Sequence, residues 1–435
     1  MDMASAVNSG FGRLAIRRYP SMKASAVCVC AAVAVMCTGM LGFGATTTQP
    51  KSLAPGDTYV LQADAFSADE TVPSPIGVSV RDTGAVGDGV ADDTTAFQSA
   101  ITKAKVKNES VVVPPGTYRI TGTLVLNRQA LIGATSGTWN ADSCSLPKIQ
   151  VAGTSGPCVR LQGGGSVRGL QFSYDWGGQQ PSSRPTTIEL AGVGCRVSEV
   201  KISGAWDAIM ADGSSNVGRS IVEKCFIVNV HHIGVRFLGS WDCSWISKVE
   251  VWSPNSTTFA SSGVGFLLGK NDVLLMSDCF VYKAQIAYQL LNTIPGCTVT
   301  GGTWGTFSNC AADFSSYGIK MEGGHGVSLS GGTYWTHFGA IWVTGTGGKL
   351  RMSGLELRAN GGPALKVEGG DLVTITGSQI KRENSSFTVP AVSVTGGSAT
   401  VVTGCVITST STGDEIAPGL SDVVVANNVV KENVQ

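Results

Sequence analysis

The sequence predicts an all-β fold of stacked coils, with one short helix closing the N-terminal end. Ten segments of similar pattern follow one another from residue 158 onward, and their starts lie 21 to 31 residues apart. Each segment is a strand, a tight glycine-rich turn and a second strand, with apolar and polar residues alternating. This period of two excludes a helical solenoid. Coils of this length bury their inward faces only by stacking on one another, which gives one long core.

The stretch from Val78 to Leu126 contains the only clear helical pattern in the body of the chain. It is predicted to form a strand, a Gly/Asp turn, a helix and a strand that ends at Pro114-Pro115-Gly116. Asp92 and Asp93 stand where a carboxylate can accept hydrogen bonds from the first free N–H groups of the helix. Residues three and four apart form one apolar stripe that must cover other apolar groups. This stripe consists of Ala96, Phe97, Ala100, Ile101 and Ala104.

The same stretch carries a family resemblance. Residues 84–101 and 111–126 read GAVGDGVADDTTAFQSAI and VVVPPGTYRITGTLVL. This pair resembles the N-terminal signature of the pectate-lyase/polygalacturonase-like superfamily, which is related to glycoside hydrolase family 28, in its rhamnogalacturonase/epimerase form. The resemblance implies a right-handed, single-stranded parallel β-helix, a fold usually built for carbohydrate chains. Because the superfamily includes hydrolases, lyases, epimerases and tailspike-type proteins, the signature indicates the fold and not the reaction.

The first 75 residues differ from the body. Four cations (Arg13, Arg17, Arg18 and Lys23) precede an uncharged, apolar run over residues 24–45. A basic stretch before such a run is typical of a signal peptide or a membrane anchor over residues 1–45, and a wrongly assigned start is the remaining alternative. Residues 46–75 are predicted to be a linker, and residues 76–435 the β-helix, with its cap over 76–126. The protein is therefore expected to be secreted or displayed on the cell surface, and anchored to the membrane if residues 24–45 are not cleaved.

Composition narrows the class of partner. The formal charge is zero, only 14% of the residues are charged and 57 are glycine. No basic patch indicates nucleic-acid binding. An acidic substrate would need local Lys or Arg, since the overall charge does not attract it.

The cysteines suggest packing more than cross-linking. Of the 12 cysteines, Cys225, Cys279 and Cys405 share one local pattern, which predicts buried thiols at equivalent positions of successive coils. Two other pairs are close enough in sequence to form disulfides in an oxidising compartment: Cys144 with Cys158, and Cys297 with Cys310.

Aligning the repeats brings aromatic residues to the end of the second strand, one in each coil. Rings about 5 Å apart along a stack could bind the apolar faces of successive sugar units. The alternative is a ladder of rings that only stabilises the fold. The predicted substrate-binding residues are Trp176, Trp206, Trp252, Tyr282, Lys283, Trp304, Trp335, His337 and Arg358.

The candidate catalytic residues lie in the same row: Asp175, Asp207, His231 and His232. Hydrolysis of a glycosidic bond needs two carboxyl groups, for which Asp175 and Asp207 are the candidates. Lysis needs a base and a cation that neutralises the uronate, for which His231, Lys283 or Arg358 are the candidates. No cofactor is certain. If the protein is a lyase, Ca²⁺ is an expected cofactor. The ion could bind in the region of Asp207, Asp212 and Asp242.

Gly324-His325-Gly326 is similar to the GHG motif of polygalacturonases. The paired-aspartate motifs that the resemblance requires upstream are missing, because Asp272 and Asp278 stand alone. The repeat alignment puts His325 on a glycine-rich turn, away from the aromatic row. It is therefore predicted to be a structural histidine.

Two functions from different classes remain open. The first is an exported polysaccharide-active enzyme, a lyase or glycoside hydrolase acting on an acidic or complex, pectin-like glycan. The second is a glycan-binding, adhesin-like or tailspike-like β-helix without catalysis. Polysaccharide is the expected partner, the membrane is contacted only through the N-terminal segment, and a homotrimer is conceivable because many β-helices trimerise.

Overall fold

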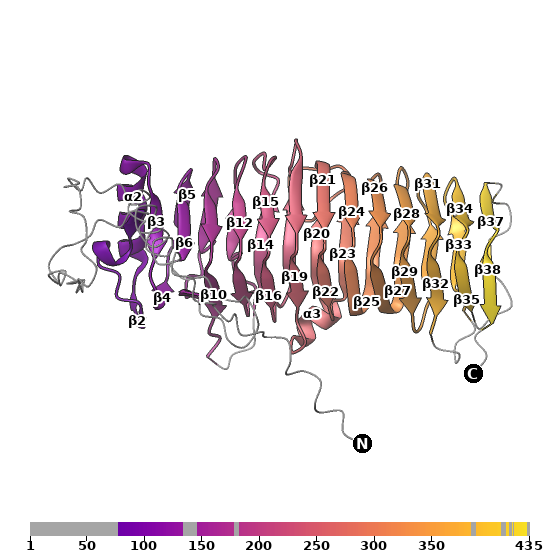
Figure 1. Cartoon of the computed structure of the whole chain (residues 1–435), viewed down its shortest axis with the longest axis horizontal. Coiled ribbons are helices and arrows are strands. Elements are labelled where there is room, and N and C mark those ends of the chain that lie inside the picture. The colour runs from indigo at the N-terminus through magenta and orange to yellow at the C-terminus, as the bar shows by residue number, and fades with distance from the viewer. Residues whose placement is uncertain are drawn as a thin grey trace, which may run out of the picture. The chain divides into compact units, whose positions relative to one another are not determined.

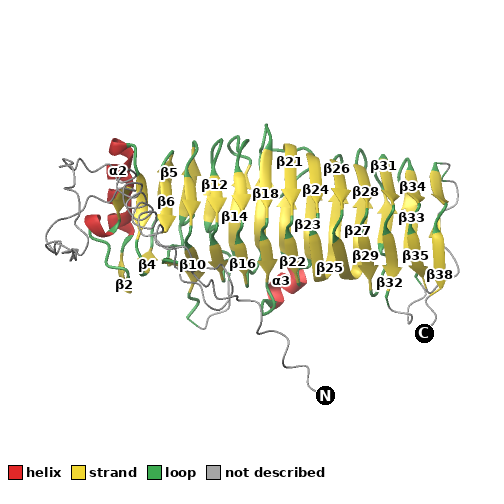
Figure 2. Ribbon diagram, in the orientation of Figure 1, coloured by secondary structure: helices red, strands yellow, loops and turns green. Residues whose placement is uncertain are grey.

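The computed structural model describes residues 77–133, 146–177, 182–383, 389–409, 415–416, 420 and 422–432, all of which belong to one compact unit, Val72–Gln435. The predicted leader, the predicted linker and Cys144 lie outside the described residues. Figures 1 and 2 show a row of coils made almost entirely of strands. The predicted parallel β-helix is confirmed, because every strand pairs in parallel with strands of the neighbouring coils. Among the described residues, no helix is long and apolar enough to cross a membrane.

Two parallel sheets run along the whole stack. The first, sheet A, has 14 strands. Its strands are β1 (Gly77–Ser79), β3 (Ser110–Val113), β6 (Ala130–Gly133), β9 (Ser166–Arg168), β12 (Arg196–Ser198), β15 (Ile221–Glu223), β18 (Ser244–Ser247), β21 (Asn271–Ser277), β24 (Thr303–Ser308), β26 (Gly326–Ser330), β28 (Lys349–Ser353), β31 (Leu372–Thr376), β34 (Thr400–Thr403) and β37 (Val423–Ala426).

The second sheet, sheet B, is folded into two rows that meet at a corner. The strands of its first row are β2 (Asp88–Asp92), β4 (Thr117–Ile120), β7 (Lys148–Val151), β10 (Gln171–Tyr174), β13 (Lys201–Ser203), β16 (Phe226–Val228), β19 (Glu250–Trp252), β22 (Phe280–Tyr282), β29 (Glu356–Ala359), β32 (Gln379–Arg382), β35 (Val406–Ser409) and β38 (Val429–Glu432). Those of its second row are β5 (Leu124–Asn127), β8 (Val159–Gln162), β11 (Ile188–Leu190), β14 (Asp207–Asp212), β17 (Ile233–Leu238), β20 (Val264–Leu268), β23 (Ile286–Leu291), β30 (Leu365–Glu368), β33 (Val392–Gly396) and β36 (Glu415–Ile416). Two long strands, β25 (Ala311–Glu322) and β27 (Thr333–Thr344), run through the corner and belong to both rows.

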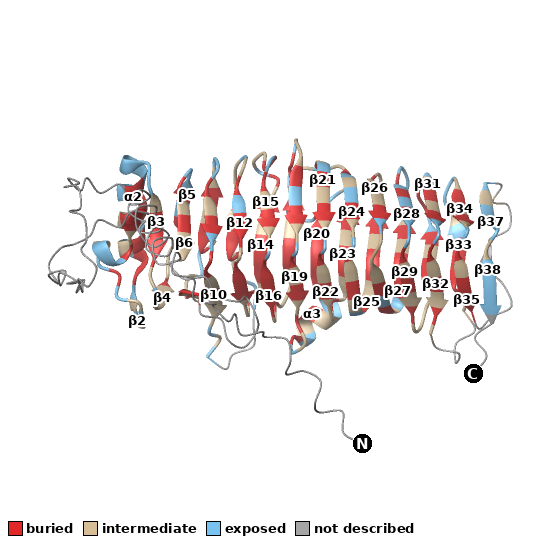
Figure 3. Ribbon diagram, viewed as in Figure 1, coloured by how far each residue is buried: buried red, intermediate tan, exposed pale blue. Residues whose placement is uncertain are grey.

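The core follows from the alternation of residues along each strand. Inward residues meet the equivalent residues of the next coil in register, as Ile202, Ile227, Val251 and Val281 do, and all four are fully buried. Figure 3 shows these buried bands repeating from coil to coil. Each fully buried aliphatic side chain contributes about 1.5–3 kcal/mol relative to exposure, so stacking is what stabilises the coils.

The cysteine pattern is confirmed. Cys225, Cys279 and Cys405 are buried, free thiols, and each Sγ donates to a carbonyl of the preceding coil at 3.7–3.8 Å. The suggested Cys297–Cys310 disulfide is wrong, because both thiols are free. Their segments form separate rungs, and proximity in sequence does not bring them together.

The cap consists of η1 (Arg81–Thr83) and helix α2 (Thr94–Lys107), which packs against β1, β3 and β5. The predicted apolar stripe is buried at Phe97, Ala100, Ile101 and Ala104 and partly buried at Ala96, and the rings of Phe97 and Tyr118 meet edge to face with centres 5.3 Å apart. The capping carboxylate is Asp92, whose Oδ1 accepts the Thr94 amide at 3.1 Å. Asp93 instead accepts the amides of Val86 and Gly87 and so fixes the turn before the helix.

The corner between the two rows of sheet B has a backbone signature. The residue after the first-row strand has a positive φ at Gly204, Asn229, Lys283 and Phe314, with φ between 50° and 74°. Glycine and asparagine adopt this conformation readily, whereas it is strained for other side chains. Helix α3 (Thr257–Ser262) is inserted at the same corner between β19 and β20. We call the outward side chains at this corner, from Asp175 to Glu383, the corner edge.

Candidate functional site

An outward-facing column runs along the first row of sheet B and leads to the corner edge. Neighbouring strands place six residues in register, from coil to coil: Val228, Trp252, Tyr282, Asp313, Trp335 and Arg358. Ring contacts continue along it, with centroids 6.3 Å apart for Trp252–Tyr282, 5.8 Å for Tyr282–Phe314 and 5.7 Å for Phe314–Trp335. The predicted aromatic column therefore exists for Trp252, Tyr282 and Trp335, with Arg358 beyond them.

Trp304 does not belong to this column, and the prediction is wrong at this position. It lies in β24 of sheet A, pairs with Gly326 and is 55% exposed. A Cβ on Gly326 would stand 2.8 Å from the Trp304 ring, so the ring lies over that glycine. Because a long loop precedes β24, the aromatic residue expected in the column falls in the sheet A strand of this coil. The residue of this coil that pairs with Tyr282 in the column is Asp313.

Asp207 and His232 form a hydrogen-bonded pair at the corner. His232 Nδ1 lies 2.8 Å from Asp207 Oδ1, and the Ile233 amide donates to the same oxygen at 3.1 Å. Asp207 is buried and His232 is half-exposed. A carboxylate oxygen accepts, so Nδ1 is the donor in this pair, and Nε2 takes no part in this hydrogen bond. Trp206 stacks on the His232 ring at 5.4 Å and 28°, which further fixes its orientation.

His231 stands beside this pair with a different partner. Its Nδ1 lies 3.0 Å from Oγ of Ser256, and that oxygen accepts the Phe259 amide at the N-terminus of α3. Burial lowers the pKa of His231 below its ordinary value, so the imidazole is neutral at neutral pH. The rings of Trp176 and His231 meet edge to face, with centres 6.1 Å apart. The corner thus holds two adjacent imidazoles, each held by a side-chain oxygen.

Asp175 and Trp176 are engaged in local structure. Asp175 is exposed, and its carboxylate accepts the Gly177 amide at 2.8 Å. No contact joins it to Asp207 in the described part of the chain, so a catalytic carboxyl pair stays a prediction. Trp176 donates from Nε1 to the Gly204 carbonyl at 2.8 Å, stacks on Tyr174 and lies under the Arg184 guanidinium at 4.5 Å.

The predicted cationic binders already have partners. Lys283 Nζ donates to the Pro254 carbonyl at 2.6 Å. Arg358 pairs with Glu356 at 2.8 Å and Glu383 at 3.3 Å, and its guanidinium lies 5.9 Å from the centre of the Trp335 ring. A bound glycan would meet these cations as parts of a network, and their role in substrate binding stays a prediction.

The sequence predictions missed a second group, around Asp313. Burial raises the pKa of Asp313 above its ordinary value, opposed by the Phe314 amide and the charge of His337. Its Oδ1 is buried without a hydrogen-bond partner. The adjacent Phe314 has φ 52° and is 46% exposed, and its ring meets the edge of His337 at 5.7 Å. Strand pairing aligns residues 280–286 with residues 311–317 without a gap. The same alignment made on the sequence would have placed Asp313 and Phe314 opposite Tyr282 and Lys283.

Comparison with known proteins agrees with the geometry of the fold. Residues 77–143 match the family model for rhamnogalacturonase A/epimerase, pectate lyase-like proteins. The predicted resemblance is confirmed. A glucan 1,3-beta-glucosidase of Cochliobolus carbonum is 24% identical over 249 residues, which cover 51% of this chain and 29% of that protein. The chain therefore matches less than a third of that relative's length.

Solved structures share the pectate-lyase-like β-helix. The A-module of the mannuronan C-5 epimerase AlgE4 of Azotobacter vinelandii superimposes with a TM-score of 0.53, at 17% identity, over 82% of this chain and 96% of the module. The Dettilon tailspike protein superimposes with a TM-score of 0.54, at 14% identity, over 81% of this chain and 68% of that chain. At these identities the likeness shows the fold.

The polygalacturonase-like GHG segment is structural, as predicted. His325 is 1% exposed, its Nδ1 accepts the Thr303 amide at 2.9 Å, and its Nε2 donates to the Glu322 carbonyl at 3.1 Å. Burial lowers its pKa to about 4. With both ring nitrogens bonded to backbone, this histidine has no capacity left for a substrate.

The candidate calcium region is occupied by other interactions. Asp212 accepts the Ser214 amide at 2.8 Å, and Asp242 pairs with Arg219 at 2.6 Å. No group of three metal-ligating side chains is found among the described residues. Calcium as a lyase cofactor stays a prediction.

Proposed function

We propose that this protein is a polysaccharide-active enzyme that binds a glycan along the corner edge and transfers a proton through His232. The oriented imidazole of His232 is the observation that carries this proposal. Asp207 holds Nδ1–H at 2.8 Å and Trp206 covers one face of the ring, so Nε2 is the basic atom of the pair. An imidazole held in one tautomer by a carboxylate is a common general base.

The geometry favours removal of a carbon-bound proton, as in lysis or epimerisation of a uronate. Asp207 already accepts hydrogen bonds from His232 and Ile233, so it is less suited to attack a sugar or to activate water. Abstraction next to a carboxylate also needs a cation to stabilise the developing charge. Arg184 over Trp176 and Lys283 at the corner supply cations on either side of the pair. Hydrolysis through Asp175 and Asp207 is the second enzymatic route.

The relatives support a carbohydrate substrate. One is a glucan 1,3-beta-glucosidase, and fold neighbours include a mannuronan C-5 epimerase and a tailspike. We extend the proposal to an acidic or complex, pectin-like glycan, to export through residues 1–45 and to calcium dependence if the reaction is lysis. A homotrimer is part of the same proposal and is tested by the mass of the purified protein in solution.

Glycan binding without catalysis is the alternative. Trp176 and Arg358 favour it, because both are held in internal hydrogen bonds and ion pairs of the kind that stabilise a rod. The tailspike fold neighbour is compatible with this class of protein.

A panel of neutral and uronate glycans separates these functions. New reducing ends report cleavage of the chain by either route, ultraviolet absorbance of an unsaturated uronate reports lysis, and proton NMR in D₂O reports exchange at the uronate α-carbon. We expect reducing ends together with unsaturation for a lyase, or exchange alone for an epimerase, and we expect His232→Gln to abolish them. Reducing ends without unsaturation would move the assignment to hydrolysis. Binding with none of the three signals would leave the non-catalytic alternative.

A further inference from the structure

A hollow on the corner edge lies well away from the Asp207–His232 pair. It is lined by Phe314, Trp335, Thr336, His337 and Asn360 and is shallow, about 10 Å³, so a ligand larger than a water molecule would lie on its rim and not inside it. The turn that carries His232 leads into β17, and Phe314 lies in β25, three strands further along this row. At about 4.8 Å per strand, the two places are about 14 Å apart along the stack. One sugar unit cannot contact both.

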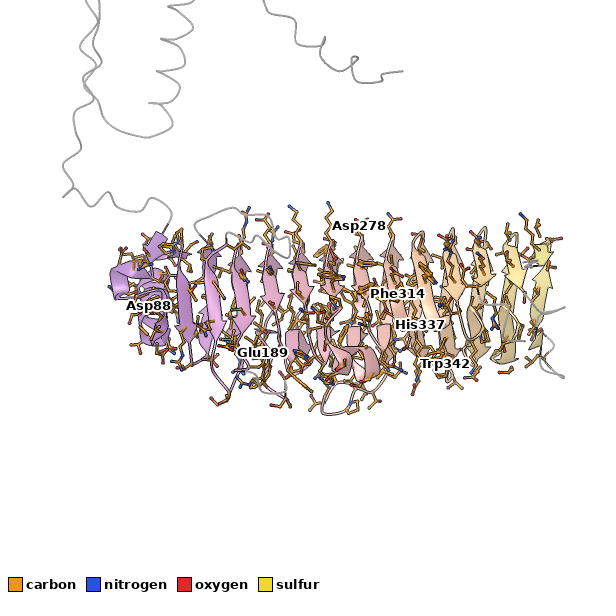
Figure 4. All side chains as sticks on the ribbon, turned by 90° about the horizontal axis from the view of Figure 1, so that it is seen from below. Asp88, Glu189, Asp278, Phe314, His337 and Trp342 are labelled. Carbon is orange, nitrogen blue, oxygen red and sulfur yellow. The ribbon has the colours of Figure 1, made fainter. Side chains whose placement is uncertain are left out.

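The hollow has an apolar wall that faces solvent. Trp335 is 37% exposed and Phe314 is 46% exposed, with their ring centres 5.7 Å apart. Figure 4 shows Phe314, His337 and Trp342 following one another across the coils, on the side away from Asp278. Ring contacts continue from His337 to Phe338 at 6.5 Å, to Tyr317 at 6.0 Å and to Trp342 at 5.2 Å. The apolar surface therefore extends around the coil as well as along the stack.

Phe314 is an unusual residue for its backbone conformation. A positive φ is unfavourable for a bulky side chain, and the equivalent positions of other coils hold Gly204, Asn229 and Lys283. Backbone strain persists where something compensates for it, and burial usually does. Phe314 is 46% exposed, so its contacts with Tyr282, Trp335 and His337 bury it only in part. The conformation holds an aromatic face at the rim of the hollow.

Asp313 supplies a polar group that also lacks a structural explanation. It stands in register between Tyr282 and Trp335, and its Oδ1 is enclosed without a hydrogen-bond partner. Buried polar atoms nearly always have partners, so an unsatisfied one requires a reason. A hydroxyl-rich ligand in the hollow could provide the missing partner if the carboxyl turns toward it. His337 and Asn360, which line the hollow, add further hydrogen-bonding groups.

We propose that this hollow is a second glycan-binding site, which stacks a pyranoside ring on Phe314 and Trp335 and bonds its hydroxyls through Asp313, His337 and Asn360. The proposal rests on the glycan-binding part of the proposed function and is independent of catalysis by His232. Neutral and uronate sugars share the required chemistry. Lys320 and Lys366 flank Trp342 at 4.5 and 5.0 Å, but each pairs with a carboxylate, Glu322 or Glu368, so neither supplies a free positive charge at the far end of this surface.

The test is calorimetric titration of the full chain carrying His232→Gln, so that turnover does not consume the ligand. The probes are a β-1,3-linked glucose hexasaccharide, a mannuronate hexasaccharide and the best binder from an array of neutral and acidic glycans. We expect Trp335→Ala and Asp313→Ala each to weaken binding about tenfold, which corresponds to about 1.4 kcal/mol. Trp304→Ala is the matched control, because this exposed tryptophan lies on sheet A, and it should bind as the parent does.

Phe314→Asn separates binding from packing. Asparagine adopts this backbone conformation with less strain, so the melting temperature should stay or rise while affinity falls. A lower melting temperature with unchanged affinity would overturn the proposal, as would equal losses in Trp335→Ala and Trp304→Ala. Failure of every glycan to bind the parent would overturn it as well. A protein without turnover in the wild type but with these affinity losses would refute the catalytic proposal and support the second site.

Discussion

His325 and His232 occupy opposite environments in one fold. His325 is buried and bonded through both nitrogens to backbone groups, between Thr303 and Glu322. His232 is half-exposed and bonded through one nitrogen to a buried carboxylate. The first imidazole completes the hydrogen bonds of a turn, while the second keeps a basic nitrogen beside solvent. A histidine can take part in chemistry only through a ring nitrogen that is not already hydrogen-bonded within the protein. The GHG motif does not show whether such a nitrogen exists.

The difference extends to the surroundings. Around His325 the chain brings glycines and main-chain groups, and burial alone lowers the pKa to about 4. Around His232 the chain brings Trp206 and Asp207 from the preceding coil, and it brings Ser256 from the following coil to the adjacent His231. Side chains converging from separate turns indicate a site, because packing alone does not require polar groups to gather at an exposed corner.

The largest effect should follow removal of the base. His232→Gln is expected to lower kcat by about 10²–10⁴, the usual contribution of a general base. Glutamine keeps a polar group near Asp207, so the melting temperature should stay close to that of the wild type. Steady-state kinetics on the best glycan of the panel, with calorimetric unfolding, give both numbers. An unchanged kcat would remove the distinction drawn between the two histidines.

His325→Ala should instead act on stability. It leaves the buried Thr303 amide without its acceptor and opens a cavity beside β24. Unsatisfied donors cost about 1–3 kcal/mol and cavities from large side chains add to that, so we expect a loss of about 3–5 kcal/mol. Chemical denaturation measures it. The folded fraction should keep its kcat, and a kcat lowered as strongly as in His232→Gln would make His325 part of the site.

Lowering the pH should reduce the stability of the folded protein through the buried His325. His325 has a folded-state pKa of about 4, below its ordinary value of 6.5, so the folded protein favours the neutral ring. Its contribution to stability is complete above pH 6.5 and is lost as the pH falls toward 4. Since one pKa unit corresponds to about 1.4 kcal/mol and the slope is partial at both ends of the interval, the loss between about pH 6.5 and about pH 4.5 is about 2 kcal/mol. Denaturation of wild type and His325→Gln at both pH values isolates this term, and equal losses would contradict it.

How far the sequence could predict these features depends on the range of the interactions. The cap stripe around Phe97 and the buried Cys225, Cys279 and Cys405 follow from local periodicity, and the structure confirms them. The column through Trp252 and Tyr282 also follows, because the residue pattern marks the end of the equivalent strand in each of these coils. These features depend only on the repeat.

The errors arise where the repeat is interrupted. The segment between β23 and β24 lengthens one coil, so Trp304 was assigned to the wrong sheet and Asp313 was missed. The partners of polar side chains were equally out of reach, since Ser256 reaches His231 only because α3 is inserted there. The sequence predicts that Lys283 binds substrate, but its ammonium group donates to the carbonyl of Pro254. The residue pattern does not show where a backbone carbonyl points. Which residues of neighbouring coils pair is decided by the tertiary structure, and the hydrogen-bond partners of polar side chains depend on that pairing.

The smallest effect should come from Trp206, whose ring supports His232 without taking part in proton transfer. Trp206→Ala is expected to weaken glycan binding by roughly 1–3 kcal/mol, the range for stacking of a planar ring on an aromatic side chain. It should lower kcat less than His232→Gln, because Asp207 still holds Nδ1 at 2.8 Å. A stability loss of about 3–5 kcal/mol would instead identify the ring as core. Trp304→Ala provides the reference for an exposed tryptophan outside the corner edge, where surface substitutions stay within about 0.5 kcal/mol. If both tryptophan variants bind glycan as the wild type does, the corner edge is not the binding surface. His232 and His325 would then differ in exposure but not in function.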